Sequence, residues 1–345
     1  MNDQPKALHT DSLLEKHLTP EIFEKLKTRQ TTSGFTLHDA VRSGRKNPDS
    51  SVGIYAGDAE SYQAFADIFD PIIHEYHRFS DERPHMSDLS VPGLENPDPE
   101  NQYIVSTRIR AARNLKGFAF TPFVSPAARQ KVEELFLEAI SGHRLSKNSR
   151  YISYENLSQK EFQSLAQNIP LFQKGDRFQE SAGINRDFPK ARGVFLSDRG
   201  RLIVWVNEED HLRVISMEQG ANIARVFTRI ADVLTFLENR IRFAKDSRYG
   251  YLNACPSNIG TAMRAGVHIR LPMLDRQRET LYRTAEKMGL QVRGTGGEKT
   301  DVRDSVFDIS NKRRLGITES ECIQSLCRGV AALVTLEKKL QPVMS

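Results

Sequence analysis

Residues 202–213 read LIVWVNEEDHLR, an apolar strand-like run that leads directly into three consecutive carboxylates, a histidine and an arginine. A second β-like run covers 213–217, so the connection between the two is short. Such a connection cannot hold a helical crossover, and the two strands should therefore pair antiparallel. Adjacent acids repel one another unless cations surround them, and strand ends are where rigid scaffolds present reactive groups. The stretch predicts an antiparallel sheet that carries a site of acids and arginines.

Further β-like runs alternate irregularly with long helical stripes in the same part of the chain. One stripe places apolar residues at helical spacing from Ile223 to Ile241, and another follows a capping box that begins at Thr318. We expect these helices to pack on the antiparallel sheet, which makes the fold class α+β. The additional β-like runs are 103–107, 249–254, 266–271 and 306–309.

Residues 1–83 show helical signals and predict a small all-α N-terminal domain. One helix should begin at Pro20, and a second should begin after Thr36 and end at Gly44. A third apolar stripe follows, with a kink expected at Pro71.

Residues 84–102 contain four prolines and little periodicity, which marks a linker before a catalytic domain at 103–345.

The net charge also differs between the N-terminal part of the chain and the rest. Residues 1–100 carry 10 Lys/Arg against 18 Asp/Glu, a net charge of −8, whereas residues 101–345 carry 39 against 26, a net charge of +13. A basic body suggests a polyanionic partner, either nucleic acid or the phosphates of a nucleotide, while a solvated basic surface is the simplest alternative.

The composition is that of a globular protein, with 39% hydrophobic and 27% charged residues among 345. No apolar run approaches the ~20 residues of a membrane span, and the first ten residues lack the apolar core of a signal peptide. Three cysteines form no disulfide framework, and so sparse a set fits a reducing compartment. We therefore expect a cytoplasmic protein.

Arginines recur at the ends of separate predicted strands. Arg108 and Arg110 share one face of a strand, because strand side chains alternate with a period of two. Arg213 follows the acidic run, and Arg264 and Arg293 lie beside glycine-containing loops. Taken singly, each fits a surface arginine. Together they would form a cage for a phosphate chain, because guanidinium groups bind phosphate oxygens bidentately and keep their charge.

Residues 294–300, GTGGEKT, resemble a phosphate-binding loop only superficially. A P-loop needs glycine immediately before lysine, and Glu298 stands there instead. A Rossmann fingerprint, protein-kinase signatures and a zinc pattern are also missing from the sequence. A nucleotide would therefore bind to arginines and glycine loops. A polyanion-binding module without turnover stays as an alternative.

Cys255 stands directly before a proline at the end of a β-like run, so its sulfur should be held at the start of a turn. Nearby arginines would lower the thiol pKa and give a thiolate able to face a cationic group. A nucleophilic enzyme that pairs this cysteine with His211 or His268 is an alternative, but the arginine excess argues for phosphate chemistry. Cys322 and Cys327 fit buried structural residues of the last helix.

Four blocks, 106–110, 207–213, 255–261 and 293–298, resemble the signature blocks of the phosphagen (guanidino) kinases, in order and behind a small helical domain. The resemblance covers nearly the whole chain. It implies a small α-helical domain and a large domain with an antiparallel β-sheet flanked by α-helices. It also implies reversible transfer of the γ-phosphoryl group of MgATP to a guanidinium. Mg²⁺ would bind through the ATP phosphates, without protein metal ligands, membrane or nucleic acid, in a monomer or homodimer.

The resemblance also assigns residues. A carboxylate should orient the guanidinium and accept its proton, while arginines neutralise the phosphates. The catalytic residues would be Glu209, Glu298, Cys255, Arg213, Arg264 and Arg293. The nucleotide would bind to Ser106, Thr107, Arg108, Ile109, Arg110, Arg213, Arg264, Ala265, Gly266, Val267, His268, Arg293, Gly294, Thr295, Gly296, Gly297, Glu298 and Asp308. The guanidino substrate would bind to Ser51, Val52, Gly53, Ile54, Tyr55, Glu209, Cys255 and Glu298.

The short loop 47–56 looks like the substrate loop of arginine kinases, where Tyr55 and neighbouring backbone would receive the amino acid. Glu298 adds the second carboxylate that arginine kinases carry at this point. Asp49 and Arg177 match a pair that in arginine kinases joins this loop to the large domain. These features favour L-arginine as the substrate, with creatine, taurocyamine and lombricine as alternatives.

Two points qualify the resemblance. Family members carry a histidine for the adenine region where Ile169 stands here. A protein-arginine kinase shares the catalytic blocks but lacks the helical domain, so residues 1–83 argue against that alternative.

We expect loop 47–56 and residues 294–303 to move as lids, because phosphoryl transfer must exclude water.

Overall fold

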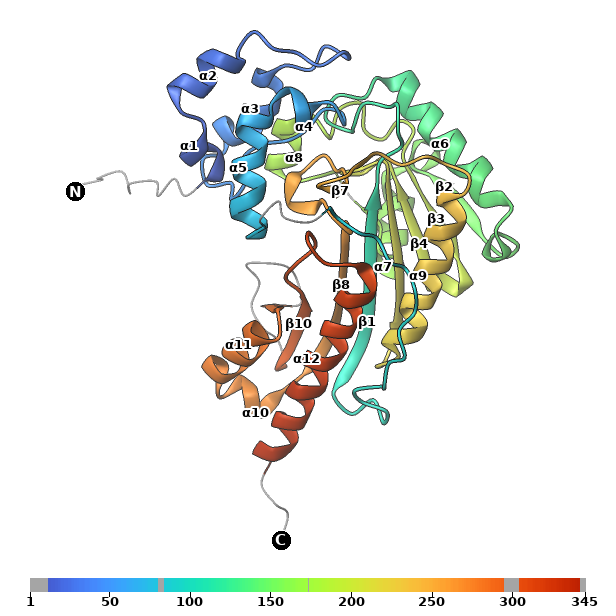
Figure 1. Ribbon diagram of the computed structural model, residues 1–345. Coiled ribbons are helices and arrows are strands. Elements are labelled where there is room, and N and C mark those ends of the chain that lie inside the picture. Colours follow the sequence, from blue (N-terminus) through green and yellow to red (C-terminus); the bar gives the residue numbers. More distant parts are fainter. Residues whose placement is uncertain (1–11, 80–83, 173, 295–303, 342–345) are drawn as a thin grey trace, which may run out of the picture.

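The computed structural model describes residues 12–79, 84–172, 174–294 and 304–341 (Figure 1). Its main sheet is antiparallel throughout, and its strands occur in the order β2-β3-β4-β5-β1-β8-β10-β9. The strands of this sheet are β1 (Ile104–Arg113), β2 (Arg150–Ser153), β3 (Gly193–Ser197), β4 (Leu202–Val206), β5 (Leu212–Gln219), β8 (Met263–Arg270), β9 (Leu290–Gly294) and β10 (Val306–Asn311), while β6 (Lys245–Asp246) and β7 (Gly250–Tyr251) form a separate pair.

The predicted antiparallel pairing of the 202–213 stretch is confirmed, because β4 pairs with β5 and Trp205 lies opposite Arg213. The turn closes with a 2.8 Å hydrogen bond from the Asn207 N–H to the His211 carbonyl. The strand expected at 249–254 is wrong for most of its length, since only Gly250–Tyr251 pairs there. Further along, the side chain of Asp210 binds the Ala254 N–H at 2.8 Å, which holds this segment in an irregular conformation.

The small domain is helical, as predicted, and packs around its own apolar core. Thr19 caps one helix, and Thr36 forms a capping box with Asp39 at the start of another, which runs two residues beyond Gly44. Helix α5 continues through Pro71, so the kink expected there stays a prediction, and the helical stripe is interrupted earlier, at Phe65. The helices are α1 (Leu13–His17), α2 (Pro20–Leu26), α3 (Leu37–Lys46), α4 (Ser61–Ala64) and α5 (Ala66–His77).

The segment 84–102 contains no helix or strand and lies along the large domain. Asp98 ends it by accepting hydrogen bonds from the N–H groups of Tyr103 and Ile104, at 2.8 and 2.7 Å. These two hydrogen bonds fix the position of the chain at the start of β1. The boundaries at 83 and 103 stay a prediction.

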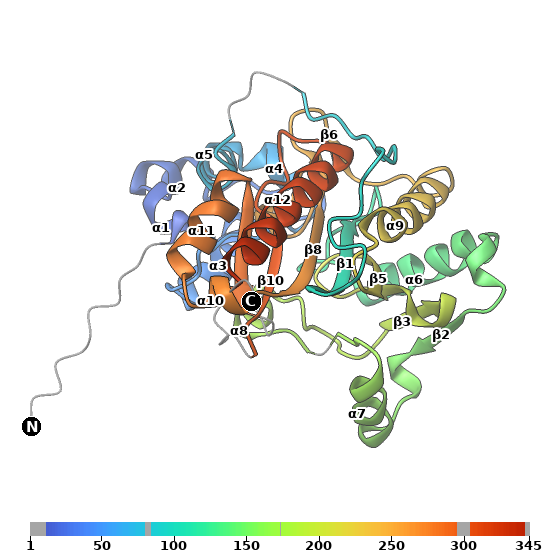
Figure 2. The same cartoon turned by 90° about the horizontal axis from the view of Figure 1, so that it is seen from below.

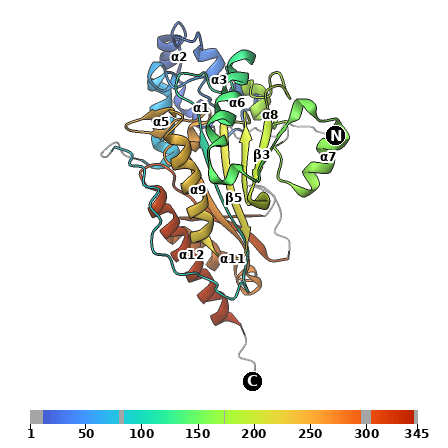
Figure 3. The same ribbon diagram turned by 90° about the vertical axis from the view of Figure 1, so that its right-hand side faces the viewer.

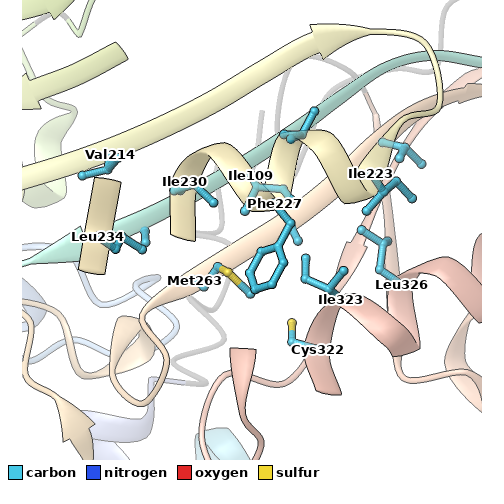
Figure 4. Close-up of a cluster of buried hydrophobic side chains, with 14 of the residues drawn as sticks. Ile109, Val214, Ile223, Phe227, Ile230, Leu234, Met263, Cys322, Ile323 and Leu326 are labelled. Carbon is cyan, nitrogen blue, oxygen red and sulfur yellow. The ribbon is translucent and has the colours of Figure 1, made fainter. Parts of the chain in front are cut away.

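One face of the sheet is covered by helices and forms the main core. Figures 2 and 3 show α9 and α12 running along this face. Figure 4 shows Phe227 of α9 and Ile323 of α12 meeting Ile109 and Met263 of the sheet. Cys322 and Cys327 are both buried in this cluster, as expected for structural cysteines. The helices of the large domain are α6 (Pro126–Ser141), α7 (Gln159–Asn168), α8 (Arg177–Ala182), α9 (Ile223–Glu238), α10 (Pro272–Asp275), α11 (Arg278–Lys287) and α12 (Glu319–Leu340), with short 3₁₀ turns η1 (Arg144–Ser146), η2 (Tyr154–Asn156), η3 (Asp198–Gly200) and η4 (Pro256–Asn258).

The opposite face of the sheet divides into two halves. On β3 and β4 the outward residues are apolar and pack beneath segment 154–172, with Trp205 among them. On β1, β8 and β10 the outward residues are polar and line an open cavity. Strand alternation therefore places the predicted phosphate arginines on the half of this face that segment 154–172 leaves open.

Candidate active site

We call the half of this face on β1, β8 and β10 the cationic half. It contains a small cavity of about 50 Å³, which we call the cationic cavity. Arg110 on β1 lies directly opposite Arg264 on β8, and Arg108 lies opposite Gly266. The sheet thus joins arginines that are more than 150 positions apart in the sequence. The lining residues are Ser106, Arg108, Arg110, Arg264, Gly266, His268 and Asp308.

Electrostatic repulsion is strong in the cationic cavity. Burial lowers the pKa of Arg108, and Arg213 and Arg264 lower it further. Burial also lowers the pKa of Arg110 well below its usual value, and the neighbouring arginines add to the effect. The Arg108 Nε is buried without a hydrogen-bond partner among the residues that the structure describes. These groups have the spacing and unsatisfied charge that an anionic ligand would relieve.

The far wall of the cavity is held by an ion pair. Arg264 donates to the Asp308 carboxylate at 2.7 Å and to Ser310 Oγ at 3.2 Å. Gly266 keeps the floor open, because a Cβ there would lie 2.9 Å from the Ser310 Cβ and 3.3 Å from Asp308 Oδ1. Any larger residue would push β8 away from β10 or occupy the space of a ligand.

Four residues assigned to the nucleotide point away from the cavity. Side chains of alternate β1 and β8 residues are buried on the helix-covered face, so they can offer a nucleotide only their backbone groups. Thr107 shows this, because its Oγ donates to the Gly220 carbonyl at 2.8 Å. The four residues are Thr107, Ile109, Ala265 and Val267.

The acidic run beside this cavity supplies Glu209, whose side chain pairs with Arg213 at 2.8 Å. Glu208 pairs with the same guanidinium at 3.1 Å. Burial raises the pKa of Glu209 to about 7, although Arg213 opposes the rise. The arginine that we expected to face phosphate is therefore held by two carboxylates, and Glu209 is a carboxyl that can exchange a proton near neutral pH.

Asp210, the third acid, is a structural residue. Its carboxylate accepts hydrogen bonds from Asn114 at 2.6 Å, from Asn253 at 2.9 Å and from the Ala254 N–H at 2.8 Å. Burial raises its pKa, while these three donors oppose the rise. The network fixes the 252–255 segment next to Glu209 and so sets the position of Cys255.

His211 does not act as a free base. Its Nδ1 accepts a hydrogen bond from the Leu115 N–H at 3.0 Å, so its Nε2 carries the proton and donates to the Ala119 carbonyl at 2.9 Å. Burial lowers its pKa to about 4. Both ring nitrogens are therefore used in packing, which removes this histidine from a Cys/His nucleophile pair.

Cys255 lies in the site, but the expected thiolate is wrong. Burial raises the pKa of its thiol to about 12, and Glu209 raises it further. The Sγ lies 3.1 Å from Ser257 Oγ. The sulfur is buried beside a carboxylate, so the neutral thiol is favoured at physiological pH.

Tyr55 reaches the same place from the small domain. Burial raises its pKa, and Cys255 and Glu209 raise it further, because these groups lie close to its hydroxyl. Backbone hydrogen bonds hold the loop to both domains. The Tyr55 N–H donates to the Ala40 carbonyl of the small domain at 3.0 Å, and the Ala56 N–H donates to the Ala254 carbonyl of the large domain at 2.8 Å. Residues 51–55 therefore lie against the edge of the acidic site.

The inner part of loop 47–56 is packed in the structure, and its movement as a lid stays a prediction. Ile54 and Ala56 are fully buried, and Gly44 of α3 touches the loop so closely that a Cβ would lie 2.4 Å from the Gly53 carbonyl. The outer part of the loop is different, because Asp49 is solvent-facing and forms an ion pair with Arg177 of α8. The pairing expected for these two residues is thus present.

Arg293 lies on β9, opposite Asp308 of β10. It lines another cavity, of about 400 Å³, rather than the cationic cavity. Gly294 ends β9. The remaining predicted residues of this block, Thr295, Gly296, Gly297 and Glu298, lie outside the described residues.

Sequence reasoning missed Arg314. It donates to the Ser257 carbonyl and to Asn258 Oδ1, each at 2.7 Å. Burial lowers the pKa of Arg314, and the positive charge of Arg264 lowers it further. The signal was available: residues 312–314 read KRR just after a predicted strand, as the other arginines do. Trp205 was also missed; its ring lies 5.5 Å from the Arg213 guanidinium.

Within the described ranges, no cluster of three acidic, histidine or cysteine side chains could hold a metal ion. In the same ranges, none of the helices combines the length and apolar character required for a membrane span.

Two curated relatives resemble almost the whole chain. Arginine kinase of Limulus polyphemus is 42% identical over 336 residues, which are 96% of this chain and 94% of the relative. Arginine kinase Lit v 2.0101 of Penaeus vannamei is 42% identical over 337 residues, which are 97% of this chain and 95% of the relative.

Solved structures share the fold. A lombricine kinase superposes with a TM-score of 0.90 at 33% identity, covering 96% of this chain and 93% of that chain. The substrate-free duplicated taurocyamine kinase of Schistosoma mansoni superposes with a TM-score of 0.89 at 34% identity, covering 95% of this chain and 47% of that chain. The predicted fold is confirmed by this likeness.

Family models agree with both comparisons. The N-terminal domain of ATP:guanido phosphotransferases matches residues 9–74, and their C-terminal catalytic domain matches residues 131–340. The two matches cover most of the helical domain and the large sheet except for strand β1, which lies between the matched ranges. The chain therefore belongs to the ATP:guanidino phosphotransferases, the phosphagen kinases, and is an enzyme that transfers a phosphoryl group between ATP and a guanidino compound.

Proposed function

We propose that this phosphagen kinase acts on L-arginine and buffers cellular energy by storing phosphoarginine in the cytoplasm. Binding of the nucleotide is supported mainly by the cationic cavity, where burial and mutual repulsion lower the pKa of Arg108 and Arg110. The three negatively charged groups of a triphosphate offset this repulsion. Phosphoryl transfer depends on positioning and charge neutralisation, which fixed arginines supply.

The nucleotide base fits beside the cationic cavity. Met217 lies opposite Arg108 in the sheet. Together with Ile169 and Ile203 it lines a cavity of about 470 Å³, whose rim includes Arg150 and Arg199. A purine ring stacked on these apolar side chains would leave its phosphates over the arginines. Ile169 would then supply apolar contact where a histidine is expected in the family.

Mg²⁺ would reach the site on the phosphates of ATP. The carboxylate of Asp308 in the cationic cavity is already paired with Arg264 at 2.7 Å, so it is poorly placed to ligate a cation. Phosphate oxygens and water supply the octahedral oxygen ligands that Mg²⁺ requires. When bound, the ion adds positive charge at the transferring phosphoryl group.

The guanidinium would enter between Tyr55, Cys255 and Glu209. Glu209 would leave Arg213 and bind the guanidinium of the substrate, which frees Arg213 for phosphate. As the new N–P bond forms, the bond between the γ-phosphorus and the bridging oxygen breaks, and the nitrogen loses a proton to Glu209. A carboxyl with a pKa of about 7 suits that exchange.

L-Arginine is favoured over other guanidines by three features. Two similar relatives are named as arginine kinases. The buried loop brings Tyr55 to the acidic site, and the ion pair between Asp49 and Arg177 ties its outer part to the large domain. Glu298 would supply a second carboxylate. Lombricine and taurocyamine are the alternatives, because structures of kinases for these compounds share the fold.

The test is to incubate the protein with MgATP and, in separate reactions, arginine, creatine, taurocyamine or lombricine. ADP release and the ³¹P signal of an N-phosphoryl product are then followed. We expect the highest kcat/KM with arginine. No turnover with any guanidine would remove the proposed reaction, and a preference for creatine would overturn the argument from the loop.

A further inference from the structure

The cavity that Arg293 lines lies apart from the cationic cavity, and the two share no lining residue. Its walls are the end of α5, η4, the end of α11 with Gly289, strand β9 and residues 312–314. In Figure 1 the end of α5 faces the loop between β10 and α12. We call it the junction cavity, because its walls come from both domains. Its volume, about 400 Å³, lies within the usual range of small-molecule sites.

Basic residues dominate the junction cavity. Its single carboxylate among the described lining residues, Glu286, is already paired with Lys312 at 3.1 Å. Arg313 donates to the Gly316 carbonyl at 3.1 Å, a neutral oxygen, and Arg314 likewise binds neutral oxygens. The lining therefore keeps excess positive charge. The charged lining residues are Arg78, Arg293, Lys312, Arg313, Arg314 and Glu286.

The small domain contributes Arg78, whose backbone is left-handed, with φ of 51°. Such a conformation is uncommon for a residue with a Cβ, and it turns the chain at the end of α5. Within the described residues, its guanidinium has no ion-pair partner. The preceding His77 donates from Nε2 to the Pro256 carbonyl at 2.8 Å and so ties α5 to η4. Burial lowers the pKa of His77 to about 4, so this histidine stays neutral and the charge of the wall comes from the arginines.

We propose that the junction cavity binds a small anion bearing a phosphoryl group, held between Arg78 of the small domain and Arg313 and Arg314 of the large domain. Guanidinium groups from two directions suit a tetrahedral oxyanion, which accepts several charge-assisted hydrogen bonds. The bound anion links the two domains. It also offsets charge on Arg314, which acts electrostatically on Arg264 and Glu209 of the active site.

Saturating MgADP separates this site from the nucleotide site. With the nucleotide present, inorganic phosphate is titrated by calorimetry at constant ionic strength, and tripolyphosphate is the second probe. We expect saturable binding of at least one probe. Phosphate binding identifies free phosphate as a sufficient ligand, whereas binding of tripolyphosphate alone identifies a phosphate chain.

The variant Arg78→Ala/Arg313→Ala should weaken this binding about tenfold or more, because two charge-assisted contacts are lost. Arg276→Ala/Arg328→Ala is the matched control, since it removes the same charge from exposed positions outside the cavity. The affinity for MgADP checks that each variant is folded. Arg313→Ala alone, which leaves α5 intact, should show a partial loss and serves if the double variant is unstable.

Two results would overturn the proposal. One is the absence of saturable binding of either probe to the MgADP-bound protein. The other is equal weakening in the cavity variant and in the matched control, which would show a general charge effect. Both results are independent of which guanidine the enzyme phosphorylates.

Discussion

The face of the sheet opposite α9 and α12 has an apolar half and a cationic half. Ile203 and Trp205 of β4 are buried beneath segment 154–172. Two strands further on, Arg108 and Arg110 of β1 face a cavity. Both halves follow the same alternation of strand side chains, and both depend on the same apolar core on the other face. Only the chemistry of the outward positions differs.

The difference shows how the fold supports a site that is unfavourable by itself. Apolar burial stabilises the first half by roughly 25 cal/mol for each Å² removed from water. The second half gathers like charges, which lower the pKa values of Arg108 and Arg110. Trp205 stands at the border, with its ring 6.0 Å from the Arg108 guanidinium and 5.5 Å from that of Arg213. The stable half therefore holds the arginines in place for a ligand.

The largest effect should come from Arg110→Met, which tests the cationic half. We expect kcat/KM for MgATP to fall about 10³-fold or more, because a preorganised charge that stabilises the transferring phosphoryl group is lost. The melting temperature should stay equal or rise, since a buried repelled cation is removed. Steady-state kinetics and thermal unfolding measure the two effects. Arg328→Met, at an exposed position on α12, is the control, and normal kinetics in the Arg110 variant would place that arginine outside the phosphate site.

Ile203→Ala tests the apolar half and should have the opposite profile. Removing a fully buried aliphatic side chain should lower the free energy of unfolding by about 2–5 kcal/mol. The KM for ATP should rise only a few-fold, since Ile203 also lines the cavity proposed for the nucleotide base. Urea unfolding measures the loss, and Val105→Ala, at a position that is 41% exposed, is the control. An unchanged free energy of unfolding would show that this side chain does not stabilise the apolar half.

Glu209→Gln tests the acidic border of the cationic half. We expect kcat to fall about 10²-fold, with a smaller change in the KM for ATP, because the residue serves the guanidinium. The wild-type enzyme should lose kcat/KM for the guanidine as pH falls below about 7, since the raised pKa leaves the carboxyl protonated there. The variant should lack that acid limb, and Glu208→Gln should keep it. An unchanged pH profile in the Glu209 variant would assign the proton to another group.

Asp49→Ala should have the smallest effect. Its ion pair with Arg177 is exposed, and exposed pairs contribute little to stability because water and salt screen them. We expect a KM for arginine a few-fold higher, with kcat and melting temperature nearly unchanged. Restoration of the KM by Asp49→Arg/Arg177→Asp would identify the pair as the cause. A large loss of kcat would instead make the loop part of the reacting site.

Much of the fold could be predicted because its signals are local. The capping box at Thr318 and the apolar stripe from Ile223 lie within single helices, and both helices occur where expected. The irregular chain after Tyr251 could not be predicted, because its cause is Asp210, more than 40 positions earlier. The same holds for Cys255: its arginine neighbours were inferred from the chain, whereas its pKa follows from burial beside Glu209.

The sequence by itself determined the antiparallel hairpin at 202–213, the helical N-terminal region and the presence of arginines on one face of β1, because turn length and side-chain period are properties of neighbouring residues. Only the tertiary structure decided which charges meet. It paired Arg110 with Arg264 across two strands, directed Glu209 to Arg213, and assigned Arg293 and Arg314 to a cavity between the domains. Those contacts depend on strand order and domain packing, which join residues that no local pattern connects.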